Sequence, residues 1–354
     1  MLPNTRTVVN VLTLVIALAL TACSHDAPRV VAPARSITGF HIVYRVETHA
    51  PDVQVTRREV TVHRPDQSSD LTYADGGTQP TSGFVGQGTR LYSVEAGALV
   101  DHGDRATGAP PGDYRLGPAL PDLVRLHLAR RMGTERVAGR TCIVYRLAGP
   151  IGDPIKPVAA GEHADECVDS QGLLLSERWE LDGKLLRLTR AERVDTTVPS
   201  DAAFAPPDLP RRQVPIGFTV VDTLPTTKVP STGQQYWLAP APPWGFGLVK
   251  RVRAITSGQT PDGPQVSDVA YVDTYARGAD VITVVHRDPS VEPVPKGFET
   301  VRAGRLGTGH VTFSTAGAAI AFAAGKWTVT VEGPLDVARV RAFAATLVPG
   351  FART

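Results

Sequence analysis

The three cysteines are the side chains of this sequence whose type and position most directly imply chemistry. Cys23 follows a largely apolar run from Val8 to Leu20, and a single positive charge, Arg6, precedes that run. This layout is typical of a cleaved signal peptide, and the run is shorter than the roughly 20 residues that a membrane-spanning helix needs. A cysteine directly after the cleavage position offers a thiol for acylation. We therefore expect residues 1–22 to be removed and the mature chain to begin at Cys23.

The segment Leu20-Thr21-Ala22-Cys23 resembles the bacterial lipobox, in which the cysteine sulfur takes a diacylglycerol and the new amino group is often acylated, for example with palmitate. Two or more acyl chains hold a protein durably at a membrane, whereas one chain binds only marginally. We expect an extracytoplasmic lipoprotein that is anchored to the cell membrane through acylated Cys23, with residues 23–36 as a flexible tether. An ordinary cleaved signal peptide, with Cys23 in place by chance, is the alternative.

Cys142 and Cys167 remain in the exported part of the chain. An even pair of cysteines in an oxidising compartment predicts a disulfide bond between them. Two alternatives stay open, namely free buried thiols and a metal site that includes His163, four residues before Cys167. The metal site has little support, because the sequence lacks the Cys-x-x-Cys or paired-histidine spacing of zinc sites.

Motifs that assemble a catalytic nucleophile or bind a phosphate are missing from the sequence. It contains no Gly-x-Ser-x-Gly, His-Glu-x-x-His, Walker loop or Ser-x-x-Lys set. The acidic pair Asp165 and Glu166 is consecutive, so on a strand the two carboxylates point to opposite faces. We therefore predict no catalytic residue, no metal site and no cofactor, and the chain is not expected to be an enzyme.

Composition and charge narrow the possible partners. The chain has 354 residues, of which 42% are hydrophobic and 20% charged, as in ordinary folded proteins. It carries 37 basic and 35 acidic side chains, and Arg6 leaves with the signal peptide, so the mature net charge is about +1. Nothing in this balance favours nucleic acid. The densest basic run, Lys250, Arg251 and Arg253, is interpreted as a solvated strand edge.

Period-two alternation dominates residues 37–204, and Phe40, Ile42 and Tyr44 show it most clearly. One helix is expected from Leu120 to Met132, with Pro121 in its first turn, Gly133 at its end, and Arg125, Arg130 and Arg131 on its solvated side. The expected strands lie at 37–46, 53–63, 69–73, 89–94, 136–147, 162–169, 173–181 and 184–194, with a hairpin turn at Asp182-Gly183.

A proline-rich segment, residues 205–215, is the best candidate for a linker between two domains, at 37–204 and 216–354. The second domain is expected to be β-rich and to end in a helix whose apolar face includes Val337, Val340 and Phe343. Its expected strands lie at 217–222, 248–256, 266–275, 281–286, 310–314, 318–322 and 327–332. The economical fold class is α+β.

Two segments resemble a known family: Gly133-Thr134-Glu135-Arg136-Val137-Ala138-Gly139-Arg140, and Val168-Asp169-Ser170-Gln171-Gly172-Leu173-Leu174-Leu175-Ser176-Glu177. They are similar to the periplasmic sigma-factor regulators RseB and MucB and, more loosely, to LolA-type lipoprotein carriers and mycobacterial lipid-binding lipoproteins. The likeness covers residues 37–204, and the segment from Gly325 to Leu347 loosely resembles the second domain of RseB-type proteins. It implies an N-terminal antiparallel half-barrel that encloses a helix, followed by a smaller β-rich α+β domain.

The resemblance also implies an apolar concavity that takes acyl chains or a peptide of a partner. Our candidates for its lining are Phe40, Tyr44, Leu123, Leu128 and Trp179, although each could be a plain core residue. The expected function is binding of an amphiphile or a partner protein, for example as an envelope-stress sensor that acts on an anti-sigma factor. A lipid or lipoprotein carrier is the first alternative, and a hydrolase of envelope polymers is the second.

Overall fold

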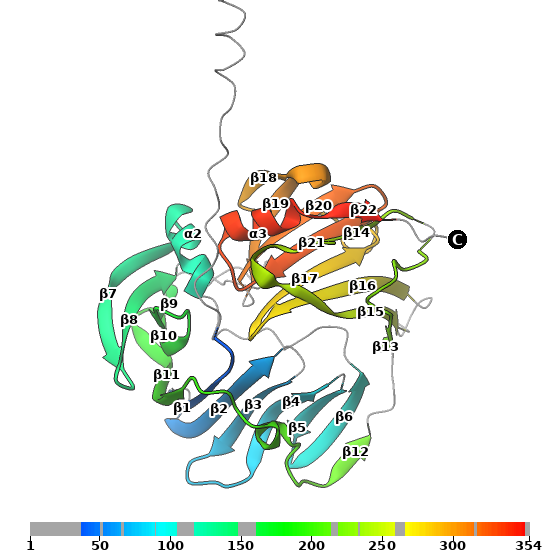
Figure 1. The fold of residues 1–354 in the computed structure, drawn as a ribbon. Helices are drawn as coiled ribbons and strands as arrows, with labels where there is room; N and C mark the ends of the chain where they lie inside the picture. The colour runs from blue at the N-terminus through cyan, green and yellow to red at the C-terminus, as the bar shows by residue number, and fades with distance from the viewer. Residues whose placement is uncertain are drawn as a thin grey trace, which may run out of the picture. The chain divides into compact units, whose positions relative to one another are not determined.

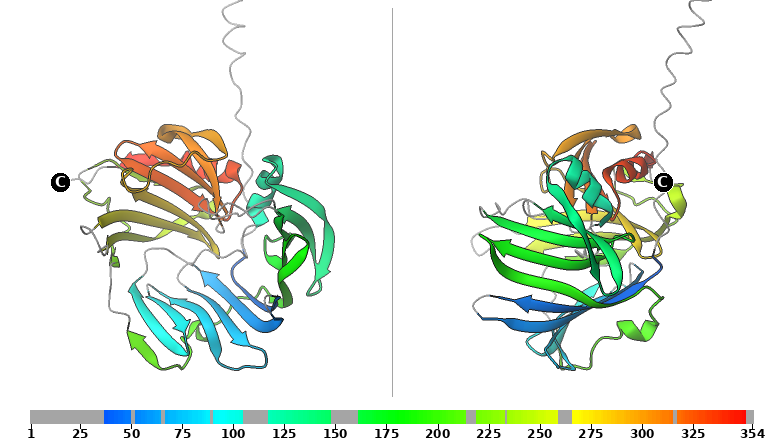
Figure 2. Two further views of the ribbon diagram at one scale, coloured as in Figure 1. Left: turned by 180° about the vertical axis from the view of Figure 1, so that it is seen from behind. Right: turned by 90° about the vertical axis from the view of Figure 1, so that its left-hand side faces the viewer.

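The structure is a computed structural model, and it describes residues 37–49, 52–64, 67–88, 90–104, 117–147, 161–213, 219–232, 234–258, 266–314 and 317–350. Two large sheets dominate this part of the chain, one with twelve strands and one with eight (Figures 1 and 2). The predicted signal peptide, Cys23 and the predicted tether fall outside the described residues. No helix among the described residues is long and apolar enough to span a membrane.

The twelve-stranded sheet is almost entirely an antiparallel meander, in the order β12-β6-β5-β4-β3-β2-β1-β11-β10-β9-β8-β7. Strands β1 and β11 pair in its middle and join two runs of hairpins, so the green strands continue the sheet beside the blue ones (Figure 2). The strands are β1 (Phe40–Thr48), β2 (Gln54–Arg64), β3 (Gln67–Ala74), β4 (Pro80–Gln87), β5 (Arg90–Glu95), β6 (Ala98–Asp104), β7 (Ala129–Val137), β8 (Arg140–Leu147), β9 (Glu162–Asp169), β10 (Leu174–Leu181), β11 (Lys184–Asp195) and β12 (Arg211–Gln213).

The eight-stranded sheet has the order β13-β15-β16-β17-β21-β20-β19-β18. Its strands are β13 (Thr219–Thr223), β15 (Gly247–Gly258), β16 (Val266–Arg277), β17 (Asp280–Arg287), β18 (Glu299–Ala303), β19 (Gly307–Ser314), β20 (Gly317–Ala324) and β21 (Trp327–Gly333). Two short strands, β14 (Tyr236–Leu238) and β22 (Val348–Gly350), pair separately. Helix α3 (Val337–Ala344) buries Val337, Val340 and Phe343, which is the apolar face that the sequence predicts.

The α+β class that we expected is wrong, because the described chain is mostly β and no helix is enclosed by a half-barrel. The predicted helix from Leu120 to Met132 is only the six-residue α2 (Leu120–Arg125), preceded by the 3-10 turn η2 (Gly117–Ala119). Beyond α2, His127 takes a positive φ of 60° and the amide of Leu128 donates to the carbonyl of Leu123, so the backbone leaves the helix. The next residues form β7, and Arg130 and Arg131 therefore lie on a strand.

The remaining short helical turns are η3 (Asp201–Phe204), η4 (Pro243–Gly245) and η5 (Gly304–Leu306). The proline-rich segment contains β12, which pairs in parallel with β6 and covers that end of the first sheet. Leu209 of the same segment packs against a small apolar cluster formed by Tyr92, Val94 and Leu99. This segment is thus part of the first sheet's packing, and the domain boundaries given above stay predictions.

Candidate functional site

The two cysteines outside the signal region are bonded to each other in the structure. Cys142 lies on β8 and Cys167 on the neighbouring β9, with their Cα atoms 5.3 Å apart and both side chains buried. The bond excludes Cys167 as a metal ligand together with His163. Among the described residues, no group of three or more His, Cys, Asp or Glu side chains is arranged to hold a metal ion.

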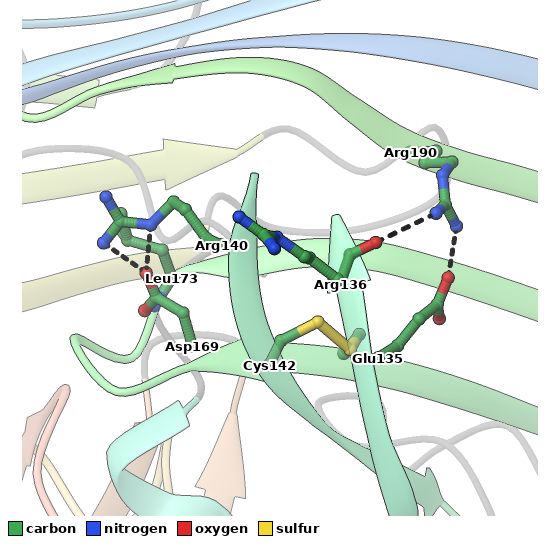
Figure 3. The surroundings of a disulfide bond; sticks show 8 residues. Glu135, Arg136, Arg140, Cys142, Asp169, Leu173 and Arg190 are labelled. Atoms are coloured by element: carbon green, nitrogen blue, oxygen red, sulfur yellow. Dashed lines mark hydrogen bonds and ion pairs between the residues drawn. A yellow bond between two sulfur atoms is a disulfide. The ribbon is translucent and has the colours of Figure 1, made fainter. Parts of the chain in front are cut away.

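Strands β7–β11 roll up around this disulfide, and we call them the rolled segment (Figures 1 and 3). β7 and β11 are separated by three strands in the sheet, yet Arg190 Nη1 of β11 donates to Glu135 Oε1 of β7 at 2.6 Å. Glu135 of β7 lies opposite Cys142 of β8. On the other side of the disulfide, Ser176 of β10 lies between Cys167 of β9 and Arg190 of β11. Directly opposed residues share a face of a sheet. The disulfide therefore lies on the inner face of the rolled segment.

Asp169 organises the turn between β9 and β10, and this turn is one of the two segments on which the family resemblance rests. Its Oδ1 accepts hydrogen bonds from the amides of Gln171 and Leu173 at 2.8 and 2.9 Å. Its Oδ2 accepts from Arg140 Nε at 2.8 Å, as Figure 3 shows. Gly172 takes a φ of +81°, a conformation that side chains with a Cβ rarely adopt. Arg140 of one segment and Asp169 of the other thus bond to each other. The residues that carry the family resemblance therefore stabilise a turn.

Four of the five predicted lining residues belong to one large apolar core, whose buried members come from both sheets. Phe40, Tyr44 and Leu123 are completely or almost completely buried in it, and Leu128 packs against it while partly exposed. Tyr44 also donates its hydroxyl proton to the carbonyl of Leu174 at 2.7 Å. We call these residues and their buried neighbours the apolar cluster. Burial of this kind is typical of a protein core.

Trp179 does not join the apolar cluster. Its Nε1 donates to Glu162 Oε1 at 2.8 Å, and the guanidinium of Arg187 lies 5.2 Å from the centre of its ring. The indole is therefore held by charged neighbours on the rolled segment. Of the five predicted lining residues, Trp179 is the one that the structure separates from the others.

Helix α2 contributes Leu120 and Leu123 to the apolar cluster. It is held by two polar contacts, one to α3 and one to the second sheet, which we call the α2 clasp. Asp122 Oδ2 accepts a hydrogen bond from the amide of Val337, the first residue of α3, at 2.7 Å. Carboxylates are favourable at that end of a helix because of its unpaired amides and its dipole. Arg125 forms a two-bond ion pair with Glu299 of β18, at 2.6 and 2.8 Å. This pairing lowers the pKa of Glu299 below its usual value.

The second sheet contains a buried polar cluster that no local sequence pattern predicts. Arg251, which we had placed on a solvated edge, is only 2% exposed and binds Asp273 through two nitrogens, including a 2.6 Å bond from Nε. Tyr236 donates to the same carboxylate at 3.0 Å and stacks on His286. Complete burial lowers the pKa of His286 to about 4. A partner for Arg251 lies 22 residues away in the sequence, and no local pattern marks it.

A serine, a histidine and a carboxylate meet on β5 and β6, which bears on the hydrolase alternative. Ser93 Oγ lies 2.6 Å from His102 Nε2 and 2.6 Å from Glu95 Oε1. A hydroxyl has one proton, and a carboxylate can only accept, so Ser93 donates to Glu95 and His102 must donate to Ser93. A histidine that donates to the serine cannot act as its general base. All three side chains face solvent in part, and the arrangement is that of a surface hydrogen-bond network.

No family model matches the sequence, and no curated protein matches it. Similar solved structures do exist. A crystal structure of MucB is 16% identical, with 90% of this chain and 95% of that chain covered and a TM-score of 0.31. The MucA/MucB complex of Pseudomonas aeruginosa is 15% identical, with 89% and 94% covered and a TM-score of 0.31. A putative outer membrane lipoprotein-sorting protein domain from Vibrio parahaemolyticus is 12% identical, with 48% and 90% covered and a TM-score of 0.19. These are the kinds of protein that the two sequence segments resemble.

Proposed function

We propose that this protein is an extracytoplasmic lipoprotein, tethered to the cell membrane through acylated Cys23, that binds a partner protein without transforming it. The partner class that the sequence resemblance suggests is an anti-sigma factor with an extracytoplasmic segment. The signal-peptide layout supports export. The disulfide between Cys142 and Cys167 fits an oxidising compartment.

The packing of the apolar cluster is the observation that favours a protein partner over an amphiphile. Phe40 and Leu123 have no exposed surface, and Tyr44 has almost none. An acyl chain could reach these side chains only after the cluster had opened. Movement of α2, which carries Leu123, would open it, at a cost of about 25 cal/mol for each Å² of apolar area exposed. A polypeptide that binds an outer surface requires no such opening. The amphiphile carrier therefore remains the second candidate, and it depends on release of the α2 clasp.

The test compares the two candidates on one preparation, the disulfide-bonded chain from residue 24 onward, immobilised and exposed to detergent-solubilised envelope membranes. Mass spectrometry of the captured material should identify a membrane protein with an extracytoplasmic segment, and organic extracts of the same protein should contain no stoichiometric lipid. Beads that carry the reduced and alkylated chain serve as the control. Capture of no protein, together with a stoichiometric amphiphile in the extracts, would refute the proposal and favour the carrier.

The carrier candidate makes its own prediction at the α2 clasp. The double variant Asp122→Ala/Arg125→Ala removes both polar contacts of α2 and leaves the apolar side chains in place. If the protein carries an amphiphile, this variant should take up a fluorescent fatty acid faster than the wild type does. Equal and negligible uptake by both would argue against the carrier.

A further inference from the structure

Strand β7 ends the twelve-stranded sheet and has β8 as its single neighbour among the described strands. Every residue between Ala129 and Val137 is exposed, although a strand within a packed sheet normally buries alternate residues. Met132 is 43% exposed in the middle of the strand. The terminal strand at the opposite end, β12, also has a single described neighbour, but it is only three residues long. The nine-residue β7 is therefore the longer of the two edge strands.

The side chains of β7 carry positive charge that the described part of the chain leaves uncompensated. Arg130 and Arg131 are exposed and form no ion pair with any described residue. Arg136 donates to the carbonyl of Gly139 in its own hairpin. That carbonyl is neutral, so the positive charge of Arg136 is not balanced by this bond. The one acid of the strand, Glu135, is already neutralised by Arg190. The edge therefore presents a basic surface.

The backbone of β7 offers hydrogen-bonding groups on the side away from β8. The carbonyl of Arg136 accepts a bond from Arg190 Nη2 at 3.4 Å, which requires that this carbonyl points away from β8. In a strand, residues two apart direct their backbone groups to the same side. The register is regular from Gly133 to Val137, so the amide and carbonyl of Thr134 also point outward. An extended peptide could bond to them by adding a strand to the sheet.

From this edge we propose that β7 is the docking strand for an extended, acidic segment of the partner protein. The segment adds alongside β7, and its backbone bonds to outward groups such as those of Thr134. Because Arg130 and Arg131 are consecutive, they lie on opposite faces of the strand, so carboxylates on both faces of the added segment meet them. Opposite charge across such an interface favours encounter and selects against basic segments. This inference rests on the proposed function, since it names the surface and the partner chemistry through which that function would operate. A role of the arginines in edge protection alone is the competing explanation.

The probe is a fluorescein-labelled decapeptide in which pairs of consecutive glutamates alternate with pairs of valines, so that an added strand carries carboxylates on both faces. It is titrated with the disulfide-bonded chain from residue 24 onward and followed by anisotropy. The wild type should bind it, and Arg130→Glu/Arg131→Glu should weaken binding at least about tenfold. The matched control is Arg211→Glu/Arg212→Glu on β12, which reverses the same two adjacent charges at the other end of the sheet. It should leave binding unchanged. Circular dichroism and thermal melts verify that each variant is folded.

Thr134→Pro separates strand addition from simple charge attraction. Proline removes the outward amide of Thr134, and edge strands tolerate it because that amide does not pair with β8. The variant should weaken the peptide several-fold with all charges intact. No binding by the wild type, equal losses in the two charge-reversal variants, or full binding by Thr134→Pro would each overturn the inference. If the arginines only protect the edge, the wild type should not bind the peptide. In that case the variant Arg130→Ser/Arg131→Ser should self-associate, because the edge has lost its charges.

The membrane capture experiment keeps the two proposals apart. If the wild type and the variants Arg130→Glu/Arg131→Glu and Thr134→Pro all capture the same partner equally, the β7 inference fails and the proposed function stands. If the wild type captures no protein, the proposed function fails, and the peptide titration still decides whether β7 accepts an acidic strand.

Discussion

Replacement of Asp273 by asparagine should strongly destabilise the second sheet. Asp273 is completely buried and balances Arg251, whose side chain is 2% exposed. The substitution keeps the shape of the side chain and an oxygen for the Tyr236 hydroxyl, so its main effect is to leave a buried cation without its counter-charge. Removal of one partner of a buried ion pair typically costs about 3–5 kcal/mol. We expect the free energy of unfolding of Asp273→Asn to fall by that amount.

The assay is urea unfolding followed by tryptophan fluorescence, because Trp237 and Trp327 are buried in the part of the chain that contains the second sheet. The matched control is Asp222→Asn, which breaks the exposed pair of Asp222 with Arg253 and should cost less than about 1 kcal/mol. A double variant, Arg251→Met/Asp273→Leu, should recover part of the loss, since apolar replacement of a buried pair is often neutral. If Asp273→Asn lies within 1 kcal/mol of the control, the electrostatic argument is refuted.

Three further outcomes follow from the structure. The disulfide closes a loop with a sequence separation of 25, so Cys142→Ser/Cys167→Ser should lose about 3 kcal/mol by chemical denaturation; an unchanged midpoint would contradict this. His286 has a folded-state pKa of about 4 against 6.5 for the free side chain, so the unfolded chain binds more protons between these values. Stability should therefore fall as the pH drops from 6.5 to 4, by at most about 1.4 kcal/mol per pH unit, with a flatter profile in His286→Gln. Gly172→Ala should cost at least about 1 kcal/mol, since it forces a positive φ and places a Cβ 2.9 Å from Pro118; a thermal shift no larger than that of Gly133→Ala would argue otherwise.

Much of the strand structure could be predicted from the sequence, because alternation of apolar and polar residues is a local signal. β1, β9, β10, β11 and the hairpin at Asp182-Gly183 lie close to their expected places. β4 was missed because its glycines and serine interrupt the alternation, and a pattern of that kind is typical of turns. The predicted helix was too long because Leu128 and Met132 continue a helical spacing that the backbone abandons after Arg125. Periodicity alone cannot decide between a helix and a strand in such a short run.

The site could be predicted only as far as residue type allowed. Cysteine parity predicted the disulfide, and the family resemblance suggested the lining set, of which Phe40, Tyr44, Leu123 and Leu128 belong to one apolar core. Whether those four line a cavity or fill a core depends on what packs over them, which is a property of the tertiary structure. The α2 clasp and the pair of Arg251 with Asp273 join residues from separate elements, so their partners are invisible to local pattern. The uncovered edge of β7 was hidden for the same reason, since its arginines had been placed on a helix.

The central pairing of β1 with β11 has a consequence for how the chain folds. β1 is made early, yet His41 pairs with Asp195 of β11, so the sheet cannot close in its middle until the chain has been made through β11. Hairpins β1–β6 and β7–β11 need only local loop closure, whereas the β1–β11 junction must bring together distant parts of the chain, which is the slow kind of step in β proteins. A chain that is made from its N-terminal end would therefore leave one long side of β1 unpaired while the rest is synthesised. The Cys142–Cys167 bond lies wholly within the later hairpin run, so it can form before that junction closes and can hold β8 and β9 ready for it.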